Sequence, residues 1–381
     1  MDTGAQIRKT RRMFYMDNLR LLFTFVVILH HVCLTYAAQS GWYFYEHLYD
    51  SFTNLFLNVL MAVNRTWVLG CFFMISGYFT PGSLDRKGTL DFMKDRLIRI
   101  GIPLAIFAFL VRPTIVYFMN RGSLAQQYTY LENIFLLKNA APGPAWFLEV
   151  LLTFSFVYAL WRRGRRVLHG WEGEPWSFPS NRAILVLILV LAAFTFVLRI
   201  FLPTEKQILH LRLGNYAEYV AFFALGITAC RLRWLDKLTD RIGRQWTAIT
   251  VAAACLYTSF VVLAWSLNMN LSFFRGGLSL KTLVATYVET FIAVGSNISL
   301  VYLFRKFANT QPGPITAMAR DAYAVFIFHA PVIVAVSYLL QGRALEHPFA
   351  KFVLVFVLGT TLSFLICRFL VRKIPCAQKV L

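Results

Sequence analysis

Runs of about 20 mostly apolar residues recur along the chain, and such a run is long enough to cross the hydrocarbon core of a bilayer as a helix. Proline and glycine at Pro81-Gly82, Pro142-Gly143 and Pro312-Gly313 are predicted to mark helix ends. We predict ten membrane-spanning helices, at residues 18–38, 54–80, 100–120, 143–161, 183–202, 209–230, 246–266, 283–304, 318–340 and 351–371. The expected fold is an all-α polytopic membrane bundle that forms a single domain over residues 1–381.

Composition and charge agree with this pattern. The chain is 58% hydrophobic and carries a formal charge of +20. In a soluble protein that charge would suggest nucleic acid, but here Lys and Arg cluster in alternate loops, as cytoplasmic loops of membrane proteins do. We therefore expect a multi-pass protein of the plasma membrane with no nucleic-acid partner and both termini cytoplasmic, as a basic segment 1–16 and a tail 372–381. The six cysteines show no metal-ligand spacing, so we expect no metal site.

The stretch Asp17–Ala38 places an acid, an arginine and two histidines in an otherwise apolar segment. A charge near the bilayer centre costs roughly 2.5–3.5 kcal/mol on insertion scales, so such residues usually mark a functional site. At about 100° per residue, Arg20 and His31 lie about 20° apart on the helix surface, and Asp17 lies about 60° from Arg20. His30 points about 100° away from His31. The alternative is that these polar residues only pair with neighbouring helices.

Depth in the membrane suggests which other residues lie near His31. On the predicted topology, His31 lies about 20 Å and His329 about 17 Å from the cytoplasmic surface, and Glu149 lies about 21 Å from it. We predict that these three side chains share one layer. The spans also contain further arginines and glutamates, for which structural ion pairing is the favoured interpretation. These are Arg65, Arg112, Arg199, Glu218 and Glu289.

A basic cluster follows the second predicted helix. Arg96 and Arg99, three residues apart, lie on one side of a helical turn just before the third helix, where two guanidinium groups can converge on a phosphate. The alternative is ordinary cytoplasmic charge. Together with the stripe from Arg20 to His31, the cluster suggests coenzyme A, with its phosphates at the arginines and its pantetheine arm reaching a buried imidazole. A neutral histidine there could act as general base in acyl transfer.

At this point the sequence resembles the acyltransferase family 3 membrane proteins. The resemblance extends over residues 17–332, and the spacing from Arg20 to His31 combined with FFMISGY is its most specific part. The residues that carry it are Asp17-Asn18-Leu19-Arg20 with ten residues before His31, Gly70–Phe79 (GCFFMISGYF), Arg96–Arg99 (RLIR) followed by Pro103, residues 145–152 (AWFLEVLL) and Tyr323–Val332 (YAVFIFHAPV).

The resemblance implies a ten-helix bundle of the bacterial inner membrane. It would move an acyl group such as acetyl or succinyl from cytoplasmic acyl-CoA to a hydroxyl of an extracytoplasmic glycan. The chain looks most like the branch that includes the periplasmic glucan succinyl-transferring proteins. His31 then corresponds to the catalytic histidine, and Arg20, Arg96 and Arg99 to the CoA side, with Asp17 as the partner of Arg20.

Several alternatives stay open. Glu149 and His329 are candidate helpers of His31, but His329 could equally be a buried structural histidine, and we assign no role to His210. We expect acyl-CoA as a donor substrate, with no tightly bound cofactor, and homo-oligomerisation stays open. The rival function is a proton-coupled transporter or flippase, since such proteins also use intramembrane Arg, Glu and His.

Overall fold

The computed structural model describes residues 12–37, 41–46, 48, 50–121, 129–135, 137, 139–168, 177–208, 210–270, 274–343 and 347–380. Most of the predicted basic segment 1–16 therefore lies outside the described residues. Within these ranges the chain is helical, and its one isolated β-bridge joins Ile208 and Leu211. The predicted all-α class is confirmed.

Nine helices of the described ranges are long and apolar enough to cross a membrane. They are Phe14–Tyr36 (α1), Ser51–Lys87 (α2), Thr89–Met119 (α3 to α5), Gly143–Gly164 (η3 and most of α7), Asn181–Phe201 (α8), Asp240–Ser266 (α11), Leu280–Phe307 (α12), Gly313–Leu339 (α13) and Pro348–Lys373 (α14 with η6). The shorter elements are α6 (Tyr130–Phe135), η4 (Leu213–Asn215), α9 (Tyr216–Arg231), α10 (Trp234–Lys237) and α15 (Pro375–Val380). The side of the membrane on which the termini lie stays a prediction.

The sixth predicted span, 209–230, is wrong in its length. Its helix, α9, begins only at Tyr216 and has 16 residues, which is about 24 Å and short of a bilayer core. The preceding residues run irregularly through Pro203 and the β-bridge before the turn η4. Hydropathy alone does not distinguish an irregular apolar loop from the first turns of a helix.

Two predicted helix ends are also wrong. Pro81 does not end α2, which continues to Lys87 and stops at Gly88, where a φ of 75° favours glycine. The next helix begins at Thr89, so the basic cluster lies inside a helix and not in a loop. That helix runs to Met119 through two π-helical turns, Leu97–Gly101 (η1) and Phe107–Val111 (η2). Each turn is followed by a proline, Pro103 or Pro113, whose missing N–H breaks the regular hydrogen-bond pattern.

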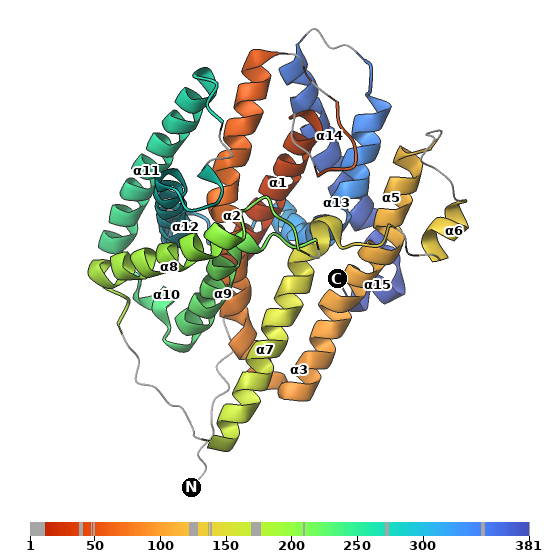
Figure 1. The fold of residues 1–381 in the computed structure, drawn as a ribbon. Coiled ribbons are helices and arrows are strands. Elements are labelled where there is room, and N and C mark those ends of the chain that lie inside the picture. The colour runs from red at the N-terminus through yellow and green to blue at the C-terminus, as the bar shows by residue number, and fades with distance from the viewer. Residues whose placement is uncertain are drawn as a thin grey trace.

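Helix α1 lies at the centre of the bundle and packs against α2, α12, α13 and α14 (Figure 1). Its first residues are fixed by Asn18, whose amide donates to the carbonyl oxygens of Ala308 at 2.8 Å and Thr310 at 3.0 Å. The N-terminal end of α1 is thereby joined to the segment between α12 and α13. The described loops 41–46 and 139–145 lie at the other end of α1, and α3 to α5 and α7 lie along one side of the bundle.

The closest helix crossing joins α2 and α9 through glycines. A Cβ placed on Gly226 would lie 2.1 Å from the carbonyl oxygen of Met74, and one on Gly77 would lie 2.1 Å from that of Phe223. No side chain fits at either position, so small residues let the two backbones touch, as is common in membrane bundles. This crossing compensates for the shortness of α9 by holding it against the long α2.

We predict that Gly77→Ala and Gly226→Ala each destabilise the protein by about 1–3 kcal/mol, because the added methyl group overpacks the crossing. Gly164→Ala is the matched control, since a Cβ there meets nothing within 4 Å. Thermal unfolding of the purified protein measures the effect. A Gly226→Ala variant as stable as Gly164→Ala would contradict the packing described here.

Candidate functional site

His31 lines a cavity of about 630 Å³ near the C-terminal end of α1. The walls come from α1, α2 and α5, from the segments around Trp42 and Pro142, and from the irregular segment before α9. Arg65, Arg112 and Arg212 also line it, so the cavity is rich in positive charge. The indole of Trp42 stacks on the His31 ring, with ring centroids 4.6 Å apart and an angle of 26° between the planes.

A second histidine orients His31. The Nδ1 of His31 lies 2.9 Å from the carbonyl oxygen of Val27 and 3.0 Å from Nε2 of His329. His329 is completely buried, and its own Nδ1 lies 2.8 Å from the carbonyl oxygen of Phe326. The sequence placed these two histidines in one layer, and the structure brings them into direct contact.

The two backbone carbonyls determine which ring nitrogens carry hydrogen. A carbonyl oxygen only accepts, so Nδ1 of His329 must be protonated to donate to Phe326, and its Nε2 is then an acceptor. That Nε2 faces Nδ1 of His31, which donates to it and to the Val27 carbonyl oxygen. In the neutral state, Nε2 of His31 therefore carries a lone pair. This tautomer follows from the hydrogen-bond partners, and it is the form that a general base needs.

His30 lines the same cavity, and its ring is nearly perpendicular to that of His31, at 86° with centroids 5.9 Å apart. Its electrostatic neighbours are Arg65 and Arg212. The structure therefore separates the surroundings of the two histidines: His31 contacts a neutral histidine, and His30 faces two arginines. A general base must accept a proton, and the neutral neighbour of His31 opposes the resulting positive charge less than the two arginines near His30 do.

Glu149 does not contact His31. Its carboxylate lies 2.9 Å from Nε2 of His210, and both side chains are partly exposed. His210 lines the cavity and has a left-handed backbone with a φ of 61°, which is uncommon outside glycine and often found at functional sites. Glu149, a predicted helper of His31, thus contacts His210 instead, and it is His210 that lines the cavity.

Sequence reasoning also missed Trp42 and Tyr43, which lie in a loop with no recognisable motif. Burial raises the pKa of Tyr43 to about 12, although the nearby Arg112 acts in the opposite direction. The phenol therefore stays protonated at physiological pH, and its oxygen is buried beside Gly143 in the wall of the cavity. No signal in the sequence distinguishes this loop aromatic pair from ordinary interfacial anchors.

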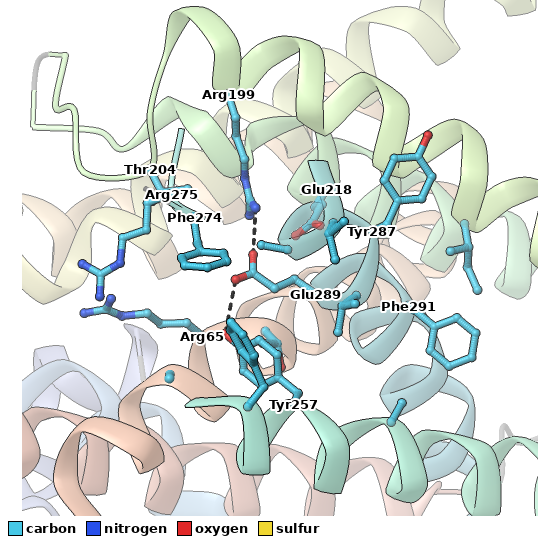
Figure 2. Close-up of a pocket in the computed structure, with 18 of the residues that line it drawn as sticks. Arg65, Arg199, Thr204, Glu218, Tyr257, Phe274, Arg275, Tyr287, Glu289 and Phe291 are labelled. Carbon is cyan, nitrogen blue, oxygen red and sulfur yellow. Dashed lines mark hydrogen bonds and ion pairs between the residues drawn. The ribbon is translucent and has the colours of Figure 1, made fainter. Parts of the chain in front are cut away.

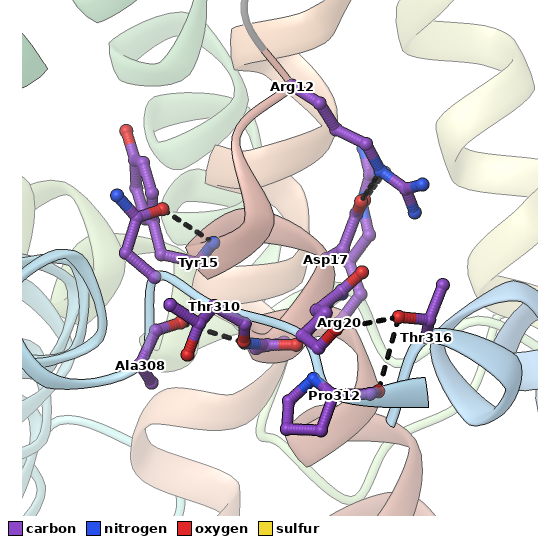
Figure 3. A network of polar contacts seen from close by, with 11 residues as sticks. Arg12, Tyr15, Asp17, Arg20, Ala308, Thr310, Pro312 and Thr316 are labelled. Atoms are coloured by element: carbon purple, nitrogen blue, oxygen red, sulfur yellow. Dashed lines mark hydrogen bonds and ion pairs between the residues drawn. The ribbon is translucent and has the colours of Figure 1, made fainter. Parts of the chain in front are cut away.

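At the opposite end of α1, Asp17 is joined to two arginines (Figure 3). Its carboxylate lies 3.5 Å from Nη1 of Arg20 and 2.9 Å from Nε of Arg12, so the predicted pairing of Asp17 with Arg20 is present. The Arg20 guanidinium also lies over the ring of Phe79, 4.4 Å from its centroid. Helix geometry places Arg20 about 16 Å from His31 along the axis of α1.

Arg96 and Arg99 lie next to this end of α1. Arg20 and Arg99 are both within electrostatic reach of Arg96, whose guanidinium lies over the ring of Phe92. Arg99 is paired with Asp95 at 3.1 Å. The three arginines that the sequence grouped are therefore neighbours in the structure.

A tyrosine from α13 completes this cluster. Pro103 has no N–H to offer to the Arg99 carbonyl four residues before it, and the hydroxyl of Tyr323 donates to that oxygen at 2.5 Å. Tyr323 and His329 lie on the same helix, α13. One helix thus contacts both the arginine cluster and His31.

Three further intramembrane charges, Arg199, Glu218 and Glu289, have partners of their own (Figure 2). Arg199 is paired with Glu289 at 2.7 Å and bonded to Asn215 at 2.7 Å, and Tyr257 donates to Glu289 at 3.3 Å. Glu218 accepts from Thr290 at 2.7 Å. The predicted structural pairing is confirmed for Arg199. Among the described residues, no three His, Cys, Asp or Glu side chains are grouped so that they could hold a metal ion.

Comparison with known proteins adds independent information. A sequence model of the acyltransferase 3 family, described as an acyltransferase domain, matches residues 13–368. The glucans biosynthesis protein C of Escherichia coli strain K12 is 22% identical over 262 residues, which are 66% of this chain and 66% of that protein. The protein of the same name from strain SE11 shows the same identity and coverage. The aligned part therefore spans about two thirds of these relatives, and no solved structure matches the chain.

The family match contains both ends of α1 and the helix α13 that contacts them. Arg20, Arg96, His31 and His329 all fall inside it, as do the nine apolar helices except for the last residues of the final one. This multi-pass membrane protein therefore belongs to the acyltransferase 3 family.

Proposed function

We propose that the protein is an acyl-CoA-dependent O-acyltransferase with His31 as its general base. The observation that carries the proposal is the hydrogen-bonded chain from Phe326 through His329 to His31, which leaves Nε2 of His31 unprotonated in a cavity large enough for an acceptor. Family membership supports acyl transfer and favours an enzyme over a transporter.

The reaction follows from this geometry. An acceptor hydroxyl gives its proton to Nε2 of His31 while its oxygen attacks the thioester carbonyl carbon. The tetrahedral intermediate then collapses, the carbon–sulfur bond breaks, and the His31 imidazolium returns the proton to the sulfur of CoA. His329 stabilises that imidazolium by accepting from its Nδ1–H, and it stays neutral throughout. The arginines of the cavity, Arg65, Arg112 and Arg212, are suited to stabilising the oxyanion.

The donor is proposed to bind at the opposite end of α1. Arg20, Arg96 and Arg99 supply clustered guanidinium groups for the phosphates of acyl-CoA. Asp17 and Asp95 hold the Arg20 and Arg99 side chains in place before the donor arrives. The pantetheine arm would follow α1 and α13 to bring the thioester to His31. This arrangement places donor binding on the side that the charge pattern assigns to the cytoplasm.

The acceptor is proposed to be a hydroxyl of a glycan on the outer side of a bacterial inner membrane. The names of the relatives refer to glucan biosynthesis, which supports a glycan acceptor here. The acyl group carried would be acetyl, succinyl or a similar group.

We expect His31→Gln to lower the rate of acyl transfer by about 10²–10⁴-fold, the usual contribution of a general base, while CoA binding persists. Membranes containing each variant would be incubated with radiolabelled acetyl-CoA, and CoA-induced thermal stabilisation would be measured on purified protein. His347→Gln, at the exposed start of α14, is the control. Retention of full activity by His31→Gln would refute the role assigned to His31.

We expect His329→Phe to lower kcat at least about tenfold with little change in KM for acyl-CoA, because His31 loses the acceptor that sets its tautomer. His329→Gln should recover part of the lost rate, since its amide oxygen can accept from Nδ1 of His31. Steady-state kinetics on the two variants test this. Equal rates in both would show that His329 only fills space.

We expect Arg96→Gln/Arg99→Gln to abolish the thermal stabilisation by CoA, because two charge-assisted contacts to phosphate are lost. The matched control is Arg241→Gln/Arg244→Gln, which removes the same charge from the exposed start of α11. Stabilisation of the wild type should also weaken with rising salt. If both double variants respond to CoA as the wild type does, the donor site lies elsewhere.

A further inference from the structure

A second cavity, of about 660 Å³, lies between α2, α8, α11 and α12 (Figure 2). Its wall is mostly apolar and includes Leu189, Leu256 and Val284, which are more than half exposed. These residues belong to three helices that are apolar enough to span a membrane, so the hydrocarbon of the bilayer is their natural surrounding. We call this cavity the lateral crevice.

One end of the lateral crevice is positively charged. Arg65 and Arg275 both line it, and Figure 2 shows their guanidinium groups beside each other. Arg275 is paired with Glu205, and the electrostatic neighbours of Arg65 are Arg275, Arg212, Glu205 and Glu289. Glu289 is engaged by Arg199. Two guanidinium groups beside each other at the end of an apolar space can bind one phosphate together.

The charged end also adjoins the His31 cavity. Arg65, Thr204 and Asn215 line both cavities. Helix α8 ends at Phe201, two residues after Arg199, so this end of the crevice lies where α8 leaves the apolar layer. Three regions therefore follow one another in space: an apolar wall, a pair of arginines and a polar cavity. They match the three parts of an anionic lipid, which are its hydrocarbon chain, its phosphate and its polar head.

We propose that the lateral crevice binds the hydrocarbon chain of an anionic lipid, that Arg65 and Arg275 bind its phosphate, and that its polar head enters the His31 cavity. The acceptor hydroxyl then reaches His31 attached to a membrane lipid. This second part rests on the proposed acyl transfer, whereas lipid binding does not. The lipid chain would supply much of the binding energy of the acceptor. It would also hold the polar head, which carries the acceptor hydroxyl, in the same cavity as the thioester.

Lipid binding is tested with protein purified in dodecyl maltoside. This uncharged detergent has the same alkyl chain as dodecyl phosphate and is present in every sample, so any difference reports on the phosphate. Dodecyl phosphate should raise Tm, and inorganic phosphate at the same concentration should not. Arg275→Gln should raise the concentration of dodecyl phosphate needed for the same rise in Tm by about 10- to 100-fold, the factor expected for a lost charge-assisted contact. Ala253→Phe, which narrows the crevice, should abolish the response. Ala252→Phe, on the neighbouring exposed position of α11, and Arg182→Gln should respond as the wild type does.

An equal response to inorganic phosphate, or none to dodecyl phosphate, would overturn the lipid site.

The acceptor part is tested by incubating membranes with radiolabelled acetyl-CoA and extracting them with chloroform and methanol. Label should enter the lipid extract with wild type and Ala252→Phe, and much less with Ala253→Phe. Label confined to the water-soluble fraction, at equal levels in both variants, would refute the lipid-anchored acceptor. If radiolabelled acetyl-CoA and radiolabelled succinyl-CoA both leave the two fractions without label, the proposed acyl transfer is refuted, while the response to dodecyl phosphate still decides lipid binding.

Discussion

The structure depends on the need to provide partners for polar groups inside an apolar bundle. The hydrocarbon core offers no water, so a buried ionisable or hydrogen-bonding group is stable only where another helix supplies a partner. Arg199 meets this requirement through Glu289 and Asn215, and Glu218 through Thr290. His31 meets it through His329, another neutral side chain, and not through a carboxylate. A histidine paired in this way stays neutral until a substrate proton arrives.

The same requirement explains how the two ends of α1 are coupled. Helix α13 supplies His329 to one end and Tyr323 to the other, where it compensates for the hydrogen bond that Pro103 removes from Arg99. The arginine cluster and the catalytic candidate are therefore positioned by one pair of packed helices. A donor that occupies both ends would be held along a rigid element, which is what orientation of a thioester against a hydroxyl requires. The lateral crevice would bring the acceptor from a third direction, through the bilayer.

Much of this could be predicted from the sequence, because hydropathy and helical periodicity are local properties. The central helix, the face shared by Asp17, Arg20 and His31, the neighbourhood of Arg96 and the level of His329 all follow from residue spacing. The remainder depends on tertiary contacts. The spacing predicts a depth for Glu149, but depth does not reveal direction, and its carboxylate contacts His210 from a distant irregular segment. The shortness of α9 also depends on a tertiary contact. A helix of 16 residues is held in the bundle there because it packs closely on the glycines of α2.

The central claim is that acyl-CoA binds along α1 with its phosphates at the arginine cluster and its acyl carbon at Nε2 of His31. A structure of the full chain in lipid nanodiscs with a non-hydrolysable acyl-CoA analogue measures this most directly. The account predicts phosphate density beside Arg20, Arg96 and Arg99, and the acyl carbon within contact distance of Nε2 of His31. Phosphates bound at the other end of α1, or an acyl carbon next to His30 and away from His31, would contradict it.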